Sequence, residues 1–184
     1  EDGIGDSCDS CNCVDDKDVE PHFVEMWDEW EYDPELSGSR YELAVDLQGN
    51  LFIIERESGR LRKYDSEKNI LWEIGSIGSG PGQFNSPGDV ETDSDGNIYV
   101  SDHGNNRIQK FTNDGKYVLE WSPPWGRGSK IAISPSGYLY VTLSQIGIDD
   151  ENILKLDLEG TLISQWKIKD NNIMDLVVDQ ADNF

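Results

Sequence analysis

The sequence predicts an all-β fold built from a repeated unit of four short strands. Three segments, residues 44–53, 91–100 and 132–141, align without gaps on a shared glycine and on the apolar residues that follow it. Each segment alternates apolar and polar residues, as β-strands do, and places its glycine in the turn between two strands. The 3.6-residue period of an amphipathic helix is not sustained in any part of the sequence.

The second half of each unit is a hairpin whose last strand carries a tryptophan. The expected turns are Lys68-Asn69, Asp114-Gly115 and Glu159-Gly160, and the tryptophans are Trp72, Trp121 and Trp166. Glycine supplies the positive φ that a tight turn requires, and the Lys-Asn turn is the weaker equivalent. Units of four short strands that recur about every 45 residues are typical of a β-propeller, whose blades pack radially. We expect the tryptophans to pack between neighbouring sheets.

Partial units flank the three complete ones. A further copy begins at Val177 and stops at Phe184, inside its expected hairpin, and residues 23–27 have the pattern of an outer strand that ends in Trp27. Three full blades with partial ones cannot close a ring, and an open propeller exposes sheet faces that should be covered. We expect further blades of a longer parent protein to cover them, and neighbouring chains are the alternative.

The middle unit resembles the NHL-repeat family in residues 78–87, 95–102 and 105–111. The first unit is degenerate, and the third has lost the equivalents of Asp102 and Arg107 and carries an inserted loop at residues 145–152. The resemblance covers roughly residues 23–184, so we assign 21–184 to the propeller. It implies a ring of blades, often six in this family, that serves as a binding platform. It also implies that Asp102 and Arg107 are structural and tie the turn between the second and third strands by charge-assisted hydrogen bonds.

The charge of the chain restricts its partners. The sequence has 37 acidic and 15 basic residues among 184, a formal net charge of −22. Such a surface repels phosphate backbones, which argues against a nucleic acid partner, and it suits hard cations such as calcium. No apolar stretch approaches the ~20 residues of a membrane-spanning helix.

Residues 1–20 form an acidic segment that precedes the expected blades. Its residues 2–11 resemble a thrombospondin type 3 repeat, whose acidic loops wrap calcium, although the loop is truncated at its start. The candidate metal ligands are Asp2, Ile4 through its carbonyl, Asp6, Asp9, Asp15, Asp16 and Asp18. All three cysteines, Cys8, Cys11 and Cys13, lie here and are disulfide candidates with one odd thiol. The resemblance implies an extracellular or cell-surface protein; a flexible acidic terminus is the alternative.

A second candidate site lies where the innermost strands begin, because a propeller brings these strands together around a central channel. The equivalent positions at the strand starts are Glu42, Asp89, Lys130 and Asp175, and Glu91 lies one step further in. A cation site at the channel mouth, with Glu42, Asp89, Glu91 and Asp175 as ligands, is one interpretation. Strand ends that are merely solvated are the other.

Loop residues supply two candidate partner contacts. Trp125, beside two prolines, has no counterpart in the other units, and local packing is the alternative to a partner contact. His103 lies in the turn between Asp102 and Arg107, where a ligand or proton-shuttle role and a merely exposed histidine are the alternatives.

We expect a binding or scaffold module that recognises a protein or a glycan through its blade loops. Two alternatives stay open. The first is a calcium- or zinc-dependent propeller enzyme, such as a lactonase-like hydrolase or a peptide-amidating lyase, which would need several His or carboxylate ligands; the only histidines are His22 and His103. The second is a structural subunit of a surface assembly, in which the open edges are interfaces.

Overall fold

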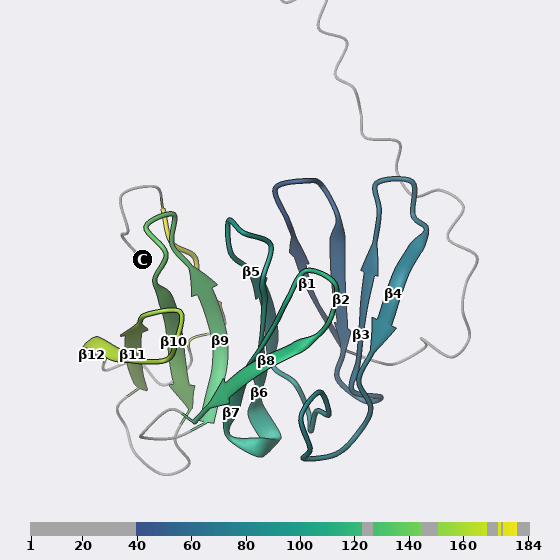
Figure 1. Cartoon of the computed structure of the whole chain (residues 1–184). Helices are drawn as coiled ribbons and strands as arrows, with labels where there is room; N and C mark the ends of the chain where they lie inside the picture. Colours follow the sequence, from purple (N-terminus) through teal and green to yellow (C-terminus); the bar gives the residue numbers. More distant parts are fainter. Residues whose placement is uncertain (1–39, 123–126, 145–150, 169–172, 174, 180–184) are drawn as a thin grey trace, which may run out of the picture. The chain divides into compact units, whose positions relative to one another are not determined.

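The computed structural model describes residues 40–122, 127–144, 151–168, 173 and 175–179 (Figure 1). The chain divides into two units, Glu1–Ser37 and Gly38–Phe184, and all described residues belong to the second. The acidic segment with its cysteines, the expected strand at residues 23–27, and Trp125 lie outside the described residues. The predictions made for them therefore stay predictions.

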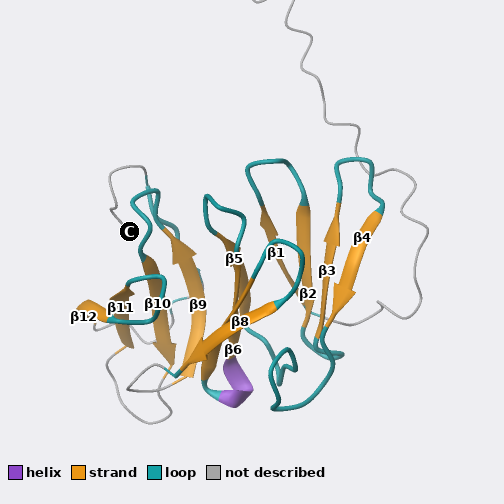
Figure 2. Cartoon of the chain, in the orientation of Figure 1, coloured by secondary structure: helices purple, strands orange, loops and turns teal. Residues whose placement is uncertain are grey.

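Three four-stranded antiparallel sheets make up the described part of the chain (Figure 2). The first contains β1 (Tyr41–Val45), β2 (Leu51–Glu55), β3 (Arg60–Tyr64) and β4 (Ile70–Ile74). The second contains β5 (Asp89–Thr92), β6 (Ile98–Asp102), β7 (Arg107–Phe111) and β8 (Tyr117–Trp121). The third contains β9 (Arg127–Ile133), β10 (Leu139–Ser144), β11 (Glu151–Leu156) and β12 (Leu162–Ile168). In each sheet, strands adjacent in sequence are adjacent in space, as predicted for propeller blades.

Short polar side chains close the hairpin turns. In the turn between β5 and β6, Asp93 Oδ1 accepts hydrogen bonds from the backbone N–H of Asp95 (3.0 Å) and of Asn97 (2.8 Å). Asp46, Asp65 and Asp157 close their turns by the same pair of bonds. Such Asx turns fix the chain reversal, and the residue three positions after the aspartate has a positive φ. The expected turns between third and fourth strands are confirmed at Gly115 (φ 78°) and Gly160 (φ 90°), whereas in the first sheet the positive φ of 70° falls on Lys68, one residue before the position expected from the Lys68-Asn69 pair.

The core consists of apolar layers between neighbouring sheets. All residues of β6 are buried. Ile98 and Val100 belong to the core cluster shared with the first sheet, while Tyr99 belongs to the cluster shared with the third. Because successive side chains of a strand point to opposite faces, the middle sheet is covered on both sides. The sheets stand beside one another in Figure 1, which confirms the predicted packing of sheet against sheet.

The recurring tryptophans pack against an aromatic residue of their own sheet. The ring centroids of Phe52 and Trp72 lie 6.0 Å apart, and Tyr99–Trp121 and Tyr140–Trp166 repeat the pair at 6.3 and 6.1 Å. The Trp72 indole N–H also donates to the Asn113 carbonyl of the second sheet (3.2 Å). Trp72 and Trp121 lie between sheets as predicted, whereas Trp166 keeps 37% of its surface exposed on the free face of the third sheet.

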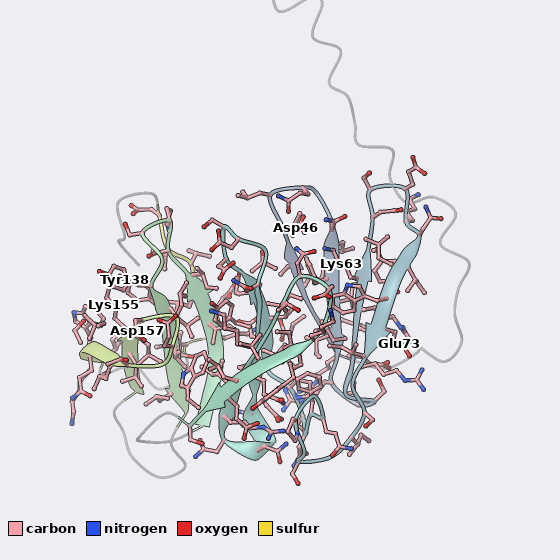
Figure 3. All side chains as sticks on the ribbon, viewed as in Figure 1. Asp46, Lys63, Glu73, Tyr138, Lys155 and Asp157 are labelled. Carbon is pink, nitrogen blue, oxygen red and sulfur yellow. The ribbon has the colours of Figure 1, made fainter. Side chains whose placement is uncertain are left out.

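A lysine accompanies each of these aromatic pairs. Lys63 Nζ lies 4.9 Å from the Phe52 ring centroid and 3.4 Å from Asp46 Oδ2, and it donates to Asn113 Oδ1 across the sheet boundary (Figure 3). Lys110 Nζ lies 5.1 Å from the Tyr99 ring centroid. Lys155 Nζ lies 5.3 Å from the Tyr140 ring centroid and 3.9 Å from that of Tyr138 (Figure 3). The lysine stems add apolar cover while their ammonium groups interact with ring faces.

The free face of the third sheet carries the start of the next unit. Leu176 is buried and, with Ile173 and Val178, packs on Ala132 and Tyr140. These residues follow the spacing of an inner strand, as expected of a fourth copy, although residues 175–179 do not pair as a strand. Across the described residues, no helix has the length and apolar character needed to cross a membrane.

Asp93→Ala should lower the free energy of unfolding by about 2 kcal/mol, because its turn loses both backbone bonds and the buried Tyr99 hydroxyl loses its acceptor. Asp65→Ala is the matched control, since it removes the same two backbone bonds from an exposed turn, and it should cost less than about 1 kcal/mol. Urea denaturation followed by tryptophan fluorescence measures both losses. Equal losses would contradict the assigned role of Asp93.

Candidate functional site

Charged residues of the three inner strands meet near one end of the sheets. Strand β1 lies beside β5, and β5 lies beside β9. Lys130 of β9 places its Nζ 2.6 Å from Glu42 Oε2 of β1 and 3.9 Å from Asp89 Oδ1 of β5. One ammonium group therefore serves two carboxylates from two other sheets.

Asp89 also joins the second sheet to the third through the backbone. Its Oδ2 accepts a hydrogen bond from the Ile131 N–H (2.9 Å), and its Oδ1 accepts one from the Val90 N–H (3.0 Å). Burial raises the pKa of Asp89 to about 6, although these bonds and the Lys130 ammonium act in the opposite direction. The carboxylate is thus held in place but is costly to keep ionised.

Glu91 lies two residues further along the same strand. The equivalent positions in the neighbouring sheets are Ala44 and Ala132, so only the second sheet has an ionisable group here. Burial raises the pKa of Glu91 to about 7, and the negative charges of Asp89 and Asp175 act in the same direction. Glu91 therefore exchanges its proton near neutral pH.

The structure brings together the residues predicted for the channel mouth. The charges of Glu42, Asp89, Glu91 and Asp175 act on one another or on the ammonium group of Lys130. Among the described residues, no group of three or more His, Cys, Asp or Glu side chains could hold a metal ion. The positive charge that the structure shows at this mouth is the Lys130 ammonium group. A metal ion on the axis stays a prediction.

A second polar network, centred on Asp102 and Arg107, lies at the same end of the second sheet. Arg107 Nε donates to Asp102 Oδ2 (2.8 Å), and both side chains are almost fully buried. Asp102 Oδ2 also accepts from Asn105 Nδ2 (2.8 Å) and from Gln109 Nε2 (3.2 Å). The predicted ion pair is therefore present in the turn between β6 and β7.

The network also holds the loop between β4 and β5, which the sequence analysis did not foresee. Arg107 donates to the carbonyls of Ser79 (2.9 Å), Gly80 (2.8 Å) and Gln83 (2.9 Å), and to Glu120 Oε2 (2.8 Å). Asp102 Oδ1 accepts a hydrogen bond from the Asn85 N–H (2.7 Å), and Asn105 Nδ2 donates one to the Gly78 carbonyl (2.8 Å). Gln109 accepts from the Gly82 N–H and donates to the Gln83 carbonyl. The glycine-rich sequence of residues 78–82 was the available signal, since such a loop exposes carbonyls that need donors.

This loop presents an apolar side chain to solvent. Phe84 is fully buried and anchors the loop, and Ile77 pairs with it through a parallel bridge. Ile77 itself keeps 67% of its surface exposed. His103, predicted as a partner contact, lies half-buried in a short 3-10 helix, His103–Asn105, at the same end. We call this end, with the β4–β5 loop, the 3-10 helix and the inner-strand starts, the loop end.

Because burial raises the pKa of Glu91, the Glu91 carboxylate binds a proton more tightly in the folded chain than in the unfolded chain. The contribution of Glu91 to stability therefore grows as pH falls through about 7, and is complete below the pKa of the unfolded chain, ~4. Asp89 acts in the same sense around pH 6.

Glu91→Gln should raise the free energy of unfolding at pH 8 by about 2 kcal/mol, and by less at pH 5. Urea denaturation at the two pH values measures the difference. Glu67→Gln, in an exposed turn, is the control and should change stability little at either pH. A gain from Glu91→Gln that is larger at pH 5 than at pH 8 would contradict the assigned burial.

Comparison with known proteins places these features in a family context. The family model described as "NHL repeat" matches residues 84–111, which include the Asp102–Arg107 network. The chain is 32% identical over 130 residues to human NHL repeat-containing protein 3, covering 66% of this chain and 36% of that protein. It is 37% identical over 89 residues to the human E3 ubiquitin-protein ligase TRIM32, covering 48% of this chain and 12% of the ligase. The chain thus spans well under half the length of these relatives.

Solved structures agree on the fold. A streptogramin B lyase superposes with a TM-score of 0.57 at 22% identity, over 74% of this chain and 42% of the lyase. A chain of a nidogen–laminin complex superposes with a TM-score of 0.54 at 18% identity, over 69% of this chain and 46% of that chain. At this identity the likeness concerns the fold alone. The chain therefore contains an NHL repeat at residues 84–111, within sheets that are blades of the β-propeller type.

Proposed function

We propose that this chain is an extracellular or cell-surface binding module that recognises a protein partner through its loop end. The observation that carries the proposal is the β4–β5 loop, which the Asp102–Arg107 network holds in one conformation while Ile77 stays exposed. NHL repeats form scaffolds for protein interactions, which supports the same function.

The rigidity of the loop favours binding. Ordering a flexible loop at an interface costs free energy that is subtracted from the affinity. Here the three loop carbonyls bonded by Arg107 and the buried Phe84 anchor fix the loop before any partner arrives. An exposed isoleucine on such a loop adds apolar contact area at little entropic cost.

The chemistry of this end favours a protein over a nucleic acid or a glycan. Ile77 offers an apolar contact, which a protein surface can match. The net charge of −22 opposes phosphate backbones. The half-buried His103 beside the loop adds a polar neighbour to the same face.

The proposal includes cover for the two outer sheet faces, which the described residues leave partly exposed. Leu43 of β1 is exposed on the first sheet, while its equivalents Val90 and Ile131 are buried against a preceding sheet. On the third sheet, Trp166 is exposed where Trp72 and Trp121 are covered. We assign further blades of the same protein to both faces, with neighbouring chains as the alternative.

The extracellular location and the calcium rest on residues 1–20 alone. The proposed ligands are those predicted from the sequence, Asp2 to Asp18, and the proposed role of calcium is to stiffen the segment that leads into the blades.

Replacing Ile77 with the photo-crosslinking residue benzoylphenylalanine should yield a covalent adduct with the partner. The labelled chain is irradiated on the surface and in the medium of the cells that produce the protein, and adducts are identified by mass spectrometry. We expect an excess of unlabelled chain to abolish the adduct, whereas an excess of chain carrying Ile77→Ser competes at least tenfold less well, because it lacks the apolar contact.

The same label at Ile70 serves as the matched control. Ile70 is an exposed isoleucine of β4, outside the braced loop. The same adduct from both positions, or equal competition by wild-type and Ile77→Ser chains, would mean that the loop is not the recognition element.

Calcium titrated into the full chain should give a calorimetric binding signal with a Kd of about 10⁻⁴ to 10⁻³ M, the range of extracellular calcium modules. Replacing Asp6 and Asp9 together with asparagine should abolish the signal, because two carboxylates leave one loop. Replacing Asp65 and Asp157 together, whose carboxylates close blade turns, is the control and should leave it unchanged. Binding that survives the first pair and is lost with the second would refute the N-terminal assignment.

A further inference from the structure

A pocket of about 340 Å³ lies at the end of the sheets opposite the loop end. Its lining residues come from all three sheets, chiefly from the turns that follow the inner strands β1, β5 and β9. Figure 1 shows these turns at the same end of the sheets. We call this end the turn end. Most of the lining is apolar, and the residues that carry the argument are Val45, Leu47, Ile133, Pro135, Leu158 and Asp95.

Leu47 stands at the tip of a turn that does not need its side chain. Asp46 Oδ1 fixes this turn by accepting from the N–H groups of Gln48 and Asn50, and Gly49 supplies the positive φ. Leu47 keeps 80% of its surface exposed, and Val45 keeps 62%. Leu47 therefore forms an apolar wall of the pocket that the folding of its turn does not explain, and Val45, which faces the same side of β1 as Leu43, is exposed beside it.

The charge around the pocket is negative. Asp95 lines the pocket and is exposed. In the hairpin turns of this end, exposed carboxylates outnumber exposed lysines: Glu67, Asp95, Asp114 and Glu159 stand against Lys68 and Lys116. Lys116 is itself paired with Asp114 at 2.6 Å. The field over the turn end therefore attracts basic segments and repels acidic ones.

We propose that this pocket binds an apolar side chain of a basic protein segment. The apolar side chain is buried against Leu47, Val45 and Ile133, while flanking lysines or arginines of the segment face Asp95 and the acidic turns. The site is at the opposite end of the sheets from the loop end, so it is a second binding site and does not depend on the proposed function. A second copy of this chain, whose net charge is −22, would bring like charge to the same surface.

The test titrates the full chain into fluorescein-labelled peptides and follows fluorescence anisotropy. The probe has a central Leu-Phe pair flanked by lysines. One matched peptide has Ser-Ser in place of Leu-Phe, and the other has glutamates in place of the lysines. We expect the probe to bind more tightly than both, and high salt to weaken its binding by screening the charges.

Leu47→Ser should weaken binding of the probe about tenfold, because one apolar wall of the pocket is lost. Ile77→Ser removes a similarly exposed apolar side chain at the loop end and should leave the affinity unchanged. Asp95→Asn should weaken binding of the lysine-flanked probe at low salt, because one carboxylate of the pocket is lost. In high salt, where the charges are screened, the same substitution should weaken it less. Since Leu47 is exposed, urea denaturation should show the same stability for Leu47→Ser and wild type.

Several results would overturn the proposal. They are no binding of the probe, equal binding of the Ser-Ser or glutamate peptide, or equal effects of Leu47→Ser and Ile77→Ser. Sedimentation velocity covers the remaining case: if the chain self-associates and Leu47→Ser abolishes this without changing peptide affinity, a second copy occupies the pocket. None of these outcomes alters the crosslinking expected at Ile77, so the two proposals fail separately.

Discussion

Burial of both faces of a β-sheet is the constraint on which the rest of this structure depends. In β6 every residue is buried, with Ile98 and Val100 facing one neighbouring sheet and Tyr99 the other. A sheet of this kind is stable only between two others, so the register of each strand must place its apolar side chains against both neighbouring layers. The carboxylate-closed turns supply that register at one end, and the Asp102–Arg107 network supplies it at the other. Because the faces are committed to packing, the two ends of the sheets are left to contact other molecules.

The loop end and the turn end are stabilised in different ways, and we therefore propose a different kind of partner for each. At the loop end, donors of Arg107 and Gln109 hold a long segment in one conformation, so an exposed side chain is presented by a rigid loop. At the turn end, each short turn is closed by its own aspartate. The turn therefore does not need the side chain at its tip, such as that of Leu47. The rigid loop at the loop end favours recognition by shape. At the turn end, the short turns leave an apolar pocket surrounded by negative charge.

Sequence periodicity predicted the sheets well, because strand alternation and turn residues are local properties. In the first unit the positive φ falls on Lys68, one residue before Asn69, which takes the place of glycine in the expected Lys68-Asn69 pair, because no glycine marks this turn in the sequence. The sequence also identified Asp102 and Arg107 as a structural pair, but it could not show that Arg107 reaches the loop carbonyls of Ser79 and Gly80, since these contacts depend on the path of a loop without period. The pocket at Leu47 was missed for a similar reason: it forms only when turns of three separate units come together.

The inner-strand charges show how a repeated fold avoids a problem that repetition itself creates. Equivalent residues of successive blades converge on one axis, so a carboxylate at this position in every unit would place like charges together. The third unit breaks the series with Lys130, whose ammonium group faces both Glu42 and Asp89. Asp89 then accepts the Ile131 N–H and so joins the second and third sheets. Glu91 lies where the neighbouring units have alanine, and burial raises its pKa to about 7 in spite of the Lys130 charge, so a proton relieves its charge near neutral pH. The cluster is therefore first a joint between sheets, and its sensitivity to pH follows from the raised pKa values of Asp89 and Glu91.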